Sequence, residues 1–315
     1  MLVPDAIRKT VIFLGEDSPE GKRWKAPAYL ISVPGGHGLE KIASIAHLTE
    51  TIRYRTTFIV TTRHAAEKLE GKRFHVRANK RNGGMATVKC GPDTKWWYHP
   101  HDKRYVDAAA TRFWPDELPD LDVEAISLEM FIDDQIIMDN KLGVGDEVFI
   151  TGLFTPTAET TRSVPIVRKG IVAMIPGEDL PFNDGLLEAH LIECGSVDGL
   201  GGSPVFVRET LQVEAAIHFK PDRNFAKVAD SRPSESFNLQ FLQDVGRFYF
   251  FGSIMECWDL QDFSTVHPET PNMGISAVVP ASKIKELILQ DGIVDLMKAR
   301  TAELQKINEA LATYD

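Results

Sequence analysis

A glycine-rich loop that runs directly into an apolar strand is the feature that most constrains the fold of this chain of 315 residues. Residues 199–204 read GLGGSP, which places three glycines and one proline within six positions. Glycine adopts backbone conformations that other residues avoid, and the run VFV at 205–207 is typical of a buried strand. The pattern predicts a tight turn that presents backbone N–H groups, rather than side chains, at the start of a strand.

Short apolar segments separated by glycine, proline and charged residues recur along most of the chain. This spacing is typical of an all-β barrel rather than of a series of βαβ units. After residue 280, apolar positions recur at helical spacing, so two helices are expected there, separated at Gly292. Strands are expected at residues 10–14, 26–33, 57–62, 106–110, 162–174, 213–219, 248–255 and 273–280. Residues 74–90 are expected to form a β-ribbon with a hairpin-like turn at 82–84, and residues 138–154 a turn followed by a strand.

The glycine-rich loop resembles the nucleophile loop of trypsin/chymotrypsin-like serine peptidases, in which the pattern Gly-x-Ser-Gly-(Gly or Ser)-Pro precedes a strand. Gly199 takes the place of the first glycine, and Gly202, Ser203 and Pro204 take the places of the last three residues. Gly201 stands where the family has its nucleophilic serine. The resemblance therefore implies a peptidase fold that lacks its attacking hydroxyl.

A histidine follows a predicted strand at residues 57–66, which read TFIVTTRHAA. This stretch resembles the family's Thr-Ala-x-His segment, and the resemblance implies His64 as the catalytic imidazole. Two aspartates compete for the carboxylate that orients this imidazole, because both are followed by an alanine-containing apolar stretch. Asp107 is preferred because its distance from His64 in the sequence is close to that usual in the family, and Asp122 is the alternative.

The resemblance also implies how the loop acts in binding. The backbone N–H groups of Gly199 and Gly201 would form the oxyanion hole, and Gly195 and Ser196 would line the primary specificity pocket. Gly195 carries no charge, so a preference for Lys or Arg is not expected. Without a hydroxyl at residue 201 an acyl-enzyme has no route, so the expected function is that of a catalytically inactive pseudoprotease that still binds peptide or protein segments.

Two other functions stay open at this point. A working endopeptidase could recruit another serine, and Ser203 and Ser196 are the nearest in sequence. Alternatively, the protein could be a scaffold or regulator that acts through its C-terminal helices. These helices are expected to pack on the barrel, with homo-oligomer formation as the alternative.

Two segments of the second half are similar to a bacterial subgroup of trypsin-like peptidases. Residues 145–149 read GDEVF, and residues 165–170 read PIVRKG. The resemblance implies two six-stranded antiparallel β-barrels of the chymotrypsin type followed by C-terminal helices. We expect the first barrel at residues 1–130, the second at 131–280 with an inserted loop at 220–238, and a helical extension at 281–315.

Charge and composition exclude several classes of partner. The formal net charge is −10 and the sequence pI is near 5.4, which argues against nucleic-acid binding. No stretch approaches 18 uninterrupted apolar residues, so a membrane span is not expected. The three cysteines form no Cys-x-x-Cys motif, and no secretory signal is evident. A reducing, cytoplasmic location is therefore expected.

Neither a metal nor a cofactor is expected. His99, His101 and Asp102 form the stretch that comes nearest to a metal-binding pattern. Zinc sites need more ligands in register than these residues supply, so we expect a surface loop here.

Overall fold

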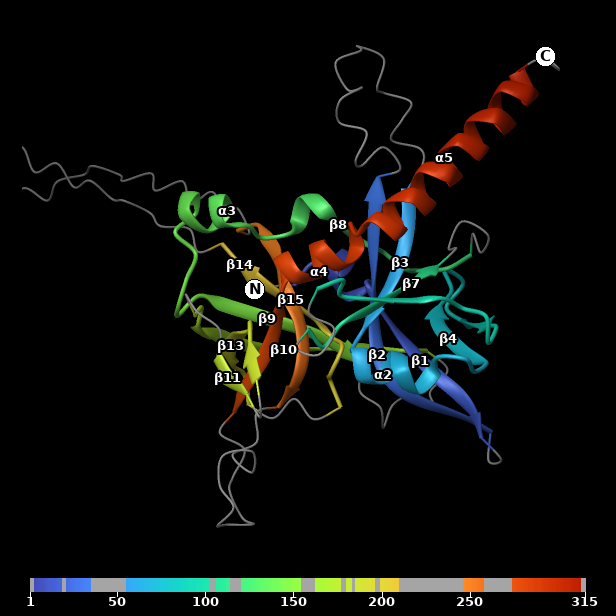
Figure 1. Cartoon of the computed structure of the whole chain (residues 1–315). Coiled ribbons are helices and arrows are strands. Elements are labelled where there is room, and N and C mark those ends of the chain that lie inside the picture. The colour runs from blue at the N-terminus through green and yellow to red at the C-terminus, as the bar shows by residue number, and fades with distance from the viewer. Residues whose placement is uncertain are drawn as a thin grey trace, which may run out of the picture.

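The computed structural model describes residues 3–18, 21–34, 55–101, 106–113, 120–153, 162–176, 180–182, 185–195, 199–209, 246–257 and 274–312. The strand expected at 213–219, the insertion expected at 220–238 and Ser196 lie outside these residues. Figure 1 shows two groups of strands side by side, with the helices α4 and α5 running across them.

The first half of the chain forms a curled sheet of eight strands. Seven strands follow the order β5-β4-β1-β2-β3-β7-β6, and β8 pairs in parallel with β2. Glycine and asparagine at residues 82–84 make the turn between β4 and β5, as expected for a hairpin. The strands are β1 Val11–Ser18, β2 Gly21–Pro34, β3 Arg55–Thr61, β4 Phe74–Asn79, β5 Met85–Cys90, β6 Trp96–Tyr98, β7 Ala109–Phe113 and β8 Ile126–Ser127.

The second half forms a closed six-stranded barrel in the order β10-β13-β16-β15-β14-β9. Its strands are β9 Glu147–Leu153, β10 Pro165–Met174, β13 His190–Glu193, β14 Pro204–Arg208, β15 Phe248–Cys257 and β16 Ile275–Pro280, and β11 Leu180–Phe182 pairs with β12 Gly185–Leu187 beside it. The all-β fold class with C-terminal helices is thereby confirmed. The division of the chain at residues 130 and 280 stays a prediction.

The helices of the described residues lie outside the sheets. They are α1 Asp5–Arg8, α2 Arg63–Leu69, the 3₁₀ turn η3 Leu128–Met130, α3 Asp134–Asp139, α4 Ala281–Ile288 and α5 Asp291–Ala312. In the part of the chain that is described, no helix is both long and apolar enough to cross a membrane.

The break between the two C-terminal helices lies two residues earlier than the sequence predicts. Gly292 belongs to the first turn of α5, and the chain turns at Leu289 and Gln290 instead. The side chain of Gln290 donates a hydrogen bond to the carbonyl of Leu287, which satisfies one of the free carbonyls at the end of α4. The carbonyl of Gln290 then accepts the first bonds of α5.

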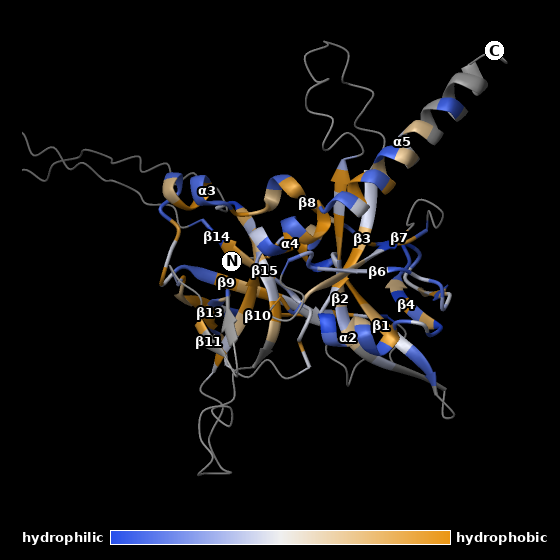
Figure 2. Cartoon of the chain, viewed as in Figure 1, coloured by the Kyte–Doolittle hydropathy of each residue, from blue (hydrophilic) through white to orange (hydrophobic). Residues whose placement is uncertain are grey.

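One apolar core joins the two groups of strands. The ring of Tyr29 in β2 lies 5.5 Å from that of Phe250 in β15, and both residues are fully buried. Figure 2 shows the most apolar segments in the strands at the centre of the molecule. Because the core is shared, segments from the two halves are held in a defined relation to one another.

Helix α4 is anchored to both halves. Glu286 accepts a hydrogen bond from His99, at 2.9 Å between Oε2 and Nε2, and Lys283 forms an ion pair with Glu188 at 2.8 Å. His99 is only 2% exposed, so the surface loop expected around this residue is wrong for its side chain. Glu286 of this helix supplies the hydrogen-bond partner that the buried imidazole needs.

Candidate functional site

His64 lies on the first turn of α2, directly after the end of β3. Strand β3 ends at Thr61, and Thr62 keeps an extended backbone with φ −65° and ψ 148° before the helix begins. The preceding strand is buried, whereas the imidazole is 41% exposed. The segment therefore holds a histidine at the surface on a rigid support.

The structure brings Asp107 to His64. The Nδ1 atom of His64 lies 3.0 Å from Oδ2 and 3.2 Å from Oδ1 of Asp107, and the backbone N–H of His64 donates to Oδ1 at 3.2 Å. Strands β3 and β7 pair with Thr61 opposite Ala109, and this register places the residues just beyond each strand end together. A carboxylate at Nδ1 orients the ring and leaves Nε2 to exchange a proton with a partner.

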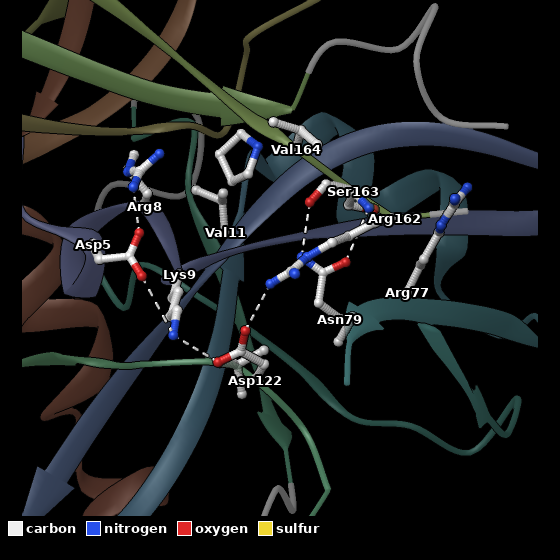
Figure 3. Close-up of a pocket in the computed structure, with 13 residues that line it drawn as sticks. Asp5, Arg8, Lys9, Val11, Arg77, Asn79, Asp122, Arg162, Ser163 and Val164 are labelled. Carbon is white, nitrogen blue, oxygen red and sulfur yellow. Dashed lines mark hydrogen bonds and ion pairs between the residues drawn. The ribbon is translucent and has the colours of Figure 1, made fainter. Parts of the chain in front are cut away.

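Asp122 is not at this site. It lines a cavity of about 260 Å³, where it forms ion pairs with Lys9 at 2.7 Å and with Arg162 at 2.9 Å (Figure 3). The hydrogen bond from Lys9 to Asp122 raises the pKa of the lysine. Beside it, the side-chain amide of Asn79 donates to the carbonyl of Ser163 and accepts from its N–H, at 2.8 and 2.9 Å. Asp122 thus helps to tie the first sheet to the segment that begins β10.

The glycine-rich loop packs directly on the segment that carries the histidine. Gly202 has φ +85°, and a Cβ there would lie 2.7 Å from the carbonyl oxygen of Pro27 and 3.3 Å from the backbone nitrogen of Thr62. The N–H of Gly202 donates to the carbonyl of Ile254 at 2.8 Å, and that of Ser203 donates to Leu200 at 2.9 Å. Only glycine fits at 202, because both its backbone conformation and its surroundings exclude a side chain.

Gly201 lies at the centre of this contact. A Cβ at this position would be 2.9 Å from the carbonyl oxygen of Met255 and 3.8 Å from Cγ2 of Thr62. In the described part of the chain, the N–H groups of Gly199 and Gly201 donate no hydrogen bond. An oxyanion hole needs two such backbone donors directed at one oxygen position.

Sequence reasoning missed Thr62. Its Oγ1 atom lies 3.4 Å from Nε2 of His64, the nitrogen that would face a serine in an intact triad. Thr62 is 1% exposed, so this hydroxyl is not open to a ligand. The signal was present in the sequence, because Thr62 stands where the related pattern Thr-Ala-x-His has alanine.

The structure does not bring Ser203 to the imidazole. Ser203 is fully buried, and its hydroxyl lies 2.7 Å from the position of a Cβ on Gly152 in β9, inside the second barrel. Among the residues described, this hydroxyl has no hydrogen-bond partner. A hydroxyl enclosed in this way faces the barrel interior and not the surface that carries His64.

Gly195, the expected floor of the specificity pocket, lies between two neighbouring segments. It has φ +68°, and a Cβ on Gly274 would be 3.4 Å from its Cα atom. The N–H of Cys194 donates to the carbonyl of Gly274 at 2.9 Å, and the thiol of Cys194 lies 3.6 Å from the hydroxyl of Ser276. Residues 194–195 and 274–276 are therefore adjacent.

Within the described ranges, no group of three or more His, Cys, Asp or Glu residues is arranged to hold a metal ion.

No family model and no curated protein matches the sequence. Similar solved structures include the MamO protease domain from Magnetospirillum magneticum, which is 13% identical with a TM-score of 0.45 and covers 91% of this chain and 99% of that chain. They also include the Drosophila Grass clip serine protease of the Toll pathway, which is 12% identical with a TM-score of 0.46 and covers 91% of this chain and 69% of that chain. Both neighbours are proteases, and at these values neither of them assigns an activity or a residue role to this chain.

Proposed function

We propose that this protein is a trypsin-like serine peptidase fold that has lost its nucleophile and binds peptide or protein segments without cleaving them. One observation carries the proposal. His64 and Asp107 form a hydrogen-bonded pair next to a glycine turn, and the residue of that turn that should supply a hydroxyl is Gly201.

Each part of the arrangement has a function that survives the loss of the hydroxyl. The amides of Gly199 and Gly201 bind a carbonyl oxygen of a bound peptide, because they depend only on backbone. His64 has no serine proton to accept, so a peptide bond at the site is held but not attacked. Removing the nucleophile from such a triad lowers kcat on the order of 10⁶-fold.

The placement of two hydroxyl groups among the described residues supports this proposal. Thr62 lies 3.4 Å from Nε2 of His64 but is 1% exposed, and Ser203 is fully buried against β9. An attacking oxygen has to approach the carbonyl carbon of a substrate to about 3 Å. A buried hydroxyl does not reach that position.

The direct test is reaction with a fluorophosphonate probe, which reports an activated serine. We expect no labelling of the natural protein and clear labelling of Gly201→Ser, and we expect His64→Ala in the Gly201→Ser background to abolish that labelling. Binding of a fluorescent peptide pool to the natural protein, measured by anisotropy, tests the second half of the proposal. Labelling of the natural protein would show that a different serine is active, and absence of peptide binding would remove the binding function.

A scaffold role through α5 is the second candidate, because this helix extends past the strands in Figure 1. Ile293, Met297 and Thr301 are buried at four-residue spacing on one face, which shows that its first half packs on the body. Removing residues 303–315 and measuring the mass by light scattering tests whether the projecting part joins two copies. An unchanged mass would leave no support for oligomer formation through this segment.

A further inference from the structure

The cavity that Asp122 lines is rich in positive charge (Figure 3). Its wall comes from α1, the start of β1, β4, residues 122–123 and residues 162–165, so both halves of the chain contribute to it. Two of the lining residues are acidic and four are cationic, which gives the lining a formal charge of +2. The cationic residues are Arg8, Lys9, Arg77 and Arg162. The whole chain has a formal net charge of −10, so the cavity is opposite in sign to the protein as a whole.

Both carboxylates of the cavity are already shared between cations. Asp122 pairs with Lys9 and Arg162, and Asp5 pairs with Arg8 and, at 3.4 Å, with Lys9. Figure 3 shows the resulting chain of ion pairs, which has an arginine at each end. The Nε atom of Arg8 is buried and has no hydrogen-bond partner among the described residues. A buried N–H without an acceptor costs stability, so this end of the chain of ion pairs favours an added oxyanion.

The two terminal arginines are accessible from solvent. The side chains of Arg8 and Arg162 are 40% and 47% exposed, whereas that of Asp122 is only 16% exposed. Apolar residues, among them Val11 and Val123, form part of the wall. Beside such a wall, opposite charges attract one another more strongly than in bulk water. A guanidinium also matches the geometry of a phosphate or a carboxylate, to which it can donate two parallel hydrogen bonds.

The size of the cavity limits the ligand to a small molecule. Its volume is about 260 Å³. One water molecule occupies about 30 Å³ of liquid, and pockets that take drug-sized ligands measure about 300–1,000 Å³. We therefore expect an anion of the size of inorganic phosphate or of a short dicarboxylate.

We propose that this cavity binds a small oxyanion, with Arg8 and Arg162 as its cationic contacts. A phosphate group and a carboxylate offer the same chemistry to these side chains, and the experiment below separates them. None of the residues that line the cavity belongs to the site around His64, so the proposal is independent of peptide binding. Because both halves of the chain line the cavity, the bound anion also links α1 to the start of β10.

The test is isothermal titration calorimetry at pH 7.5 and constant ionic strength. The titrants are sodium phosphate, sodium succinate as a dicarboxylate, and sodium chloride as the control. The natural protein is compared with Arg8→Gln, Arg162→Gln and the matched control Lys169→Gln, which removes an exposed cation that pairs with Glu147 outside the cavity. Both cavity variants should fold, because each aspartate keeps its ion pair with Lys9. Circular dichroism checks this.

We expect saturable binding of one phosphate or one succinate per chain, and none of chloride. Arg8→Gln and Arg162→Gln should each weaken the affinity about tenfold, as the loss of a charge-assisted hydrogen bond implies, and Lys169→Gln should leave it unchanged. Tighter binding of phosphate than of succinate would assign the cavity to a phosphate group, and the reverse order would assign it to a dicarboxylate.

A fourth variant, Asp122→Asn, separates a ligand site from ion pairs that only hold the fold together. It removes a carboxylate that competes with the ligand for Lys9 and Arg162, so it should bind phosphate or succinate several-fold more tightly than the natural protein. Weaker binding by Asp122→Asn would overturn the proposal. It would also be overturned by an equal loss of affinity in Lys169→Gln, or by the absence of saturable binding to the natural protein.

Discussion

Replacing Gly201 by serine tests whether the loop can present a nucleophile to His64. It also tests how the nearby hydroxyl of Thr62 affects that nucleophile. The new Cβ would stand 2.9 Å from the carbonyl oxygen of Met255, so the loop has to move by a few tenths of an ångström. Overpacking of this kind costs about 1 kcal/mol of stability, which a folded protein tolerates. The introduced oxygen must then compete with Thr62 for Nε2 of His64, because Thr62 Oγ1 already lies 3.4 Å from that nitrogen.

The competing hydrogen bond sets the size of the second effect. A neutral hydrogen bond contributes about 1 kcal/mol, which corresponds to about fivefold in rate. We therefore expect Gly201→Ser to react with a fluorophosphonate, and the double variant with Thr62→Val to react about fivefold faster. Valine has nearly the shape of threonine and replaces its hydroxyl by a methyl group. Thr62→Ser in the Gly201→Ser background retains a hydroxyl and should give no gain.

The assay is the pseudo-first-order labelling rate at neutral pH, read by gel fluorescence and by mass spectrometry of the modified peptide. Equal rates for Gly201→Ser with threonine or valine at residue 62 would refute the competition. Modification at any residue other than 201 would refute the assignment of the loop. No labelling of either variant, in proteins shown to be folded, would mean that the loop does not place a side chain near His64.

Three further predictions concern stability and reactivity. Gly202→Ala should lower the free energy of unfolding by about 3 kcal/mol, because the residue has a positive φ and the new Cβ would also lie 2.7 Å from a carbonyl oxygen. The control Gly71→Ala, at φ +71° with no atom near the new Cβ, should lower it by only about 1 kcal/mol. Equal losses of stability in urea unfolding would contradict the packing of the loop. Burial lowers the pKa of the His190 imidazole from its ordinary 6.5 to about 4. Between pH 6.5 and pH 4, therefore, only the unfolded state protonates this imidazole, and the free energy of unfolding should fall by about 3 kcal/mol as the pH drops through that range. His190→Gln should lose that part of the pH dependence, and an unchanged profile would show that the imidazole is not the cause. Burial also raises the pKa of Cys90 to about 11, so its alkylation by iodoacetamide at pH 8 should be about a hundredfold slower than that of a free thiol, and an equal rate would show that the thiol is exposed.

Much of the architecture could be predicted because it depends on local patterns. Apolar runs between turn residues marked β1, β2, β9, β10 and β16, and a glycine turn before a β-branched run marked the start of β14. Strands and tight turns follow from side-chain alternation and backbone preference, both of which can be read from neighbouring residues.

Local patterns did not separate the two aspartates, and only the spacing from His64 favoured Asp107. Asp107 and Asp122 stand in similar sequence surroundings, yet one lies 3.0 Å from His64 and the other pairs with Lys9. The pairing register of β3 and β7 places Asp107, and not Asp122, beside His64. Such pairing joins segments that are far apart in the sequence, so the residues next to each aspartate do not reveal it. The position of the helix break was misjudged for a related reason, since Gln290 ends α4 through a side-chain contact that glycine content does not predict.

By itself, the sequence determined the β-rich class, the turn at residues 199–204 and the absence of a hydroxyl at Gly201, because each depends only on which residues are neighbours in the chain. The tertiary structure decided which of the two candidate carboxylates meets His64 and that Thr62 faces its other nitrogen. These are contacts between residues whose proximity is set by the shared core and by the closure of the barrel, and a linear pattern contains neither.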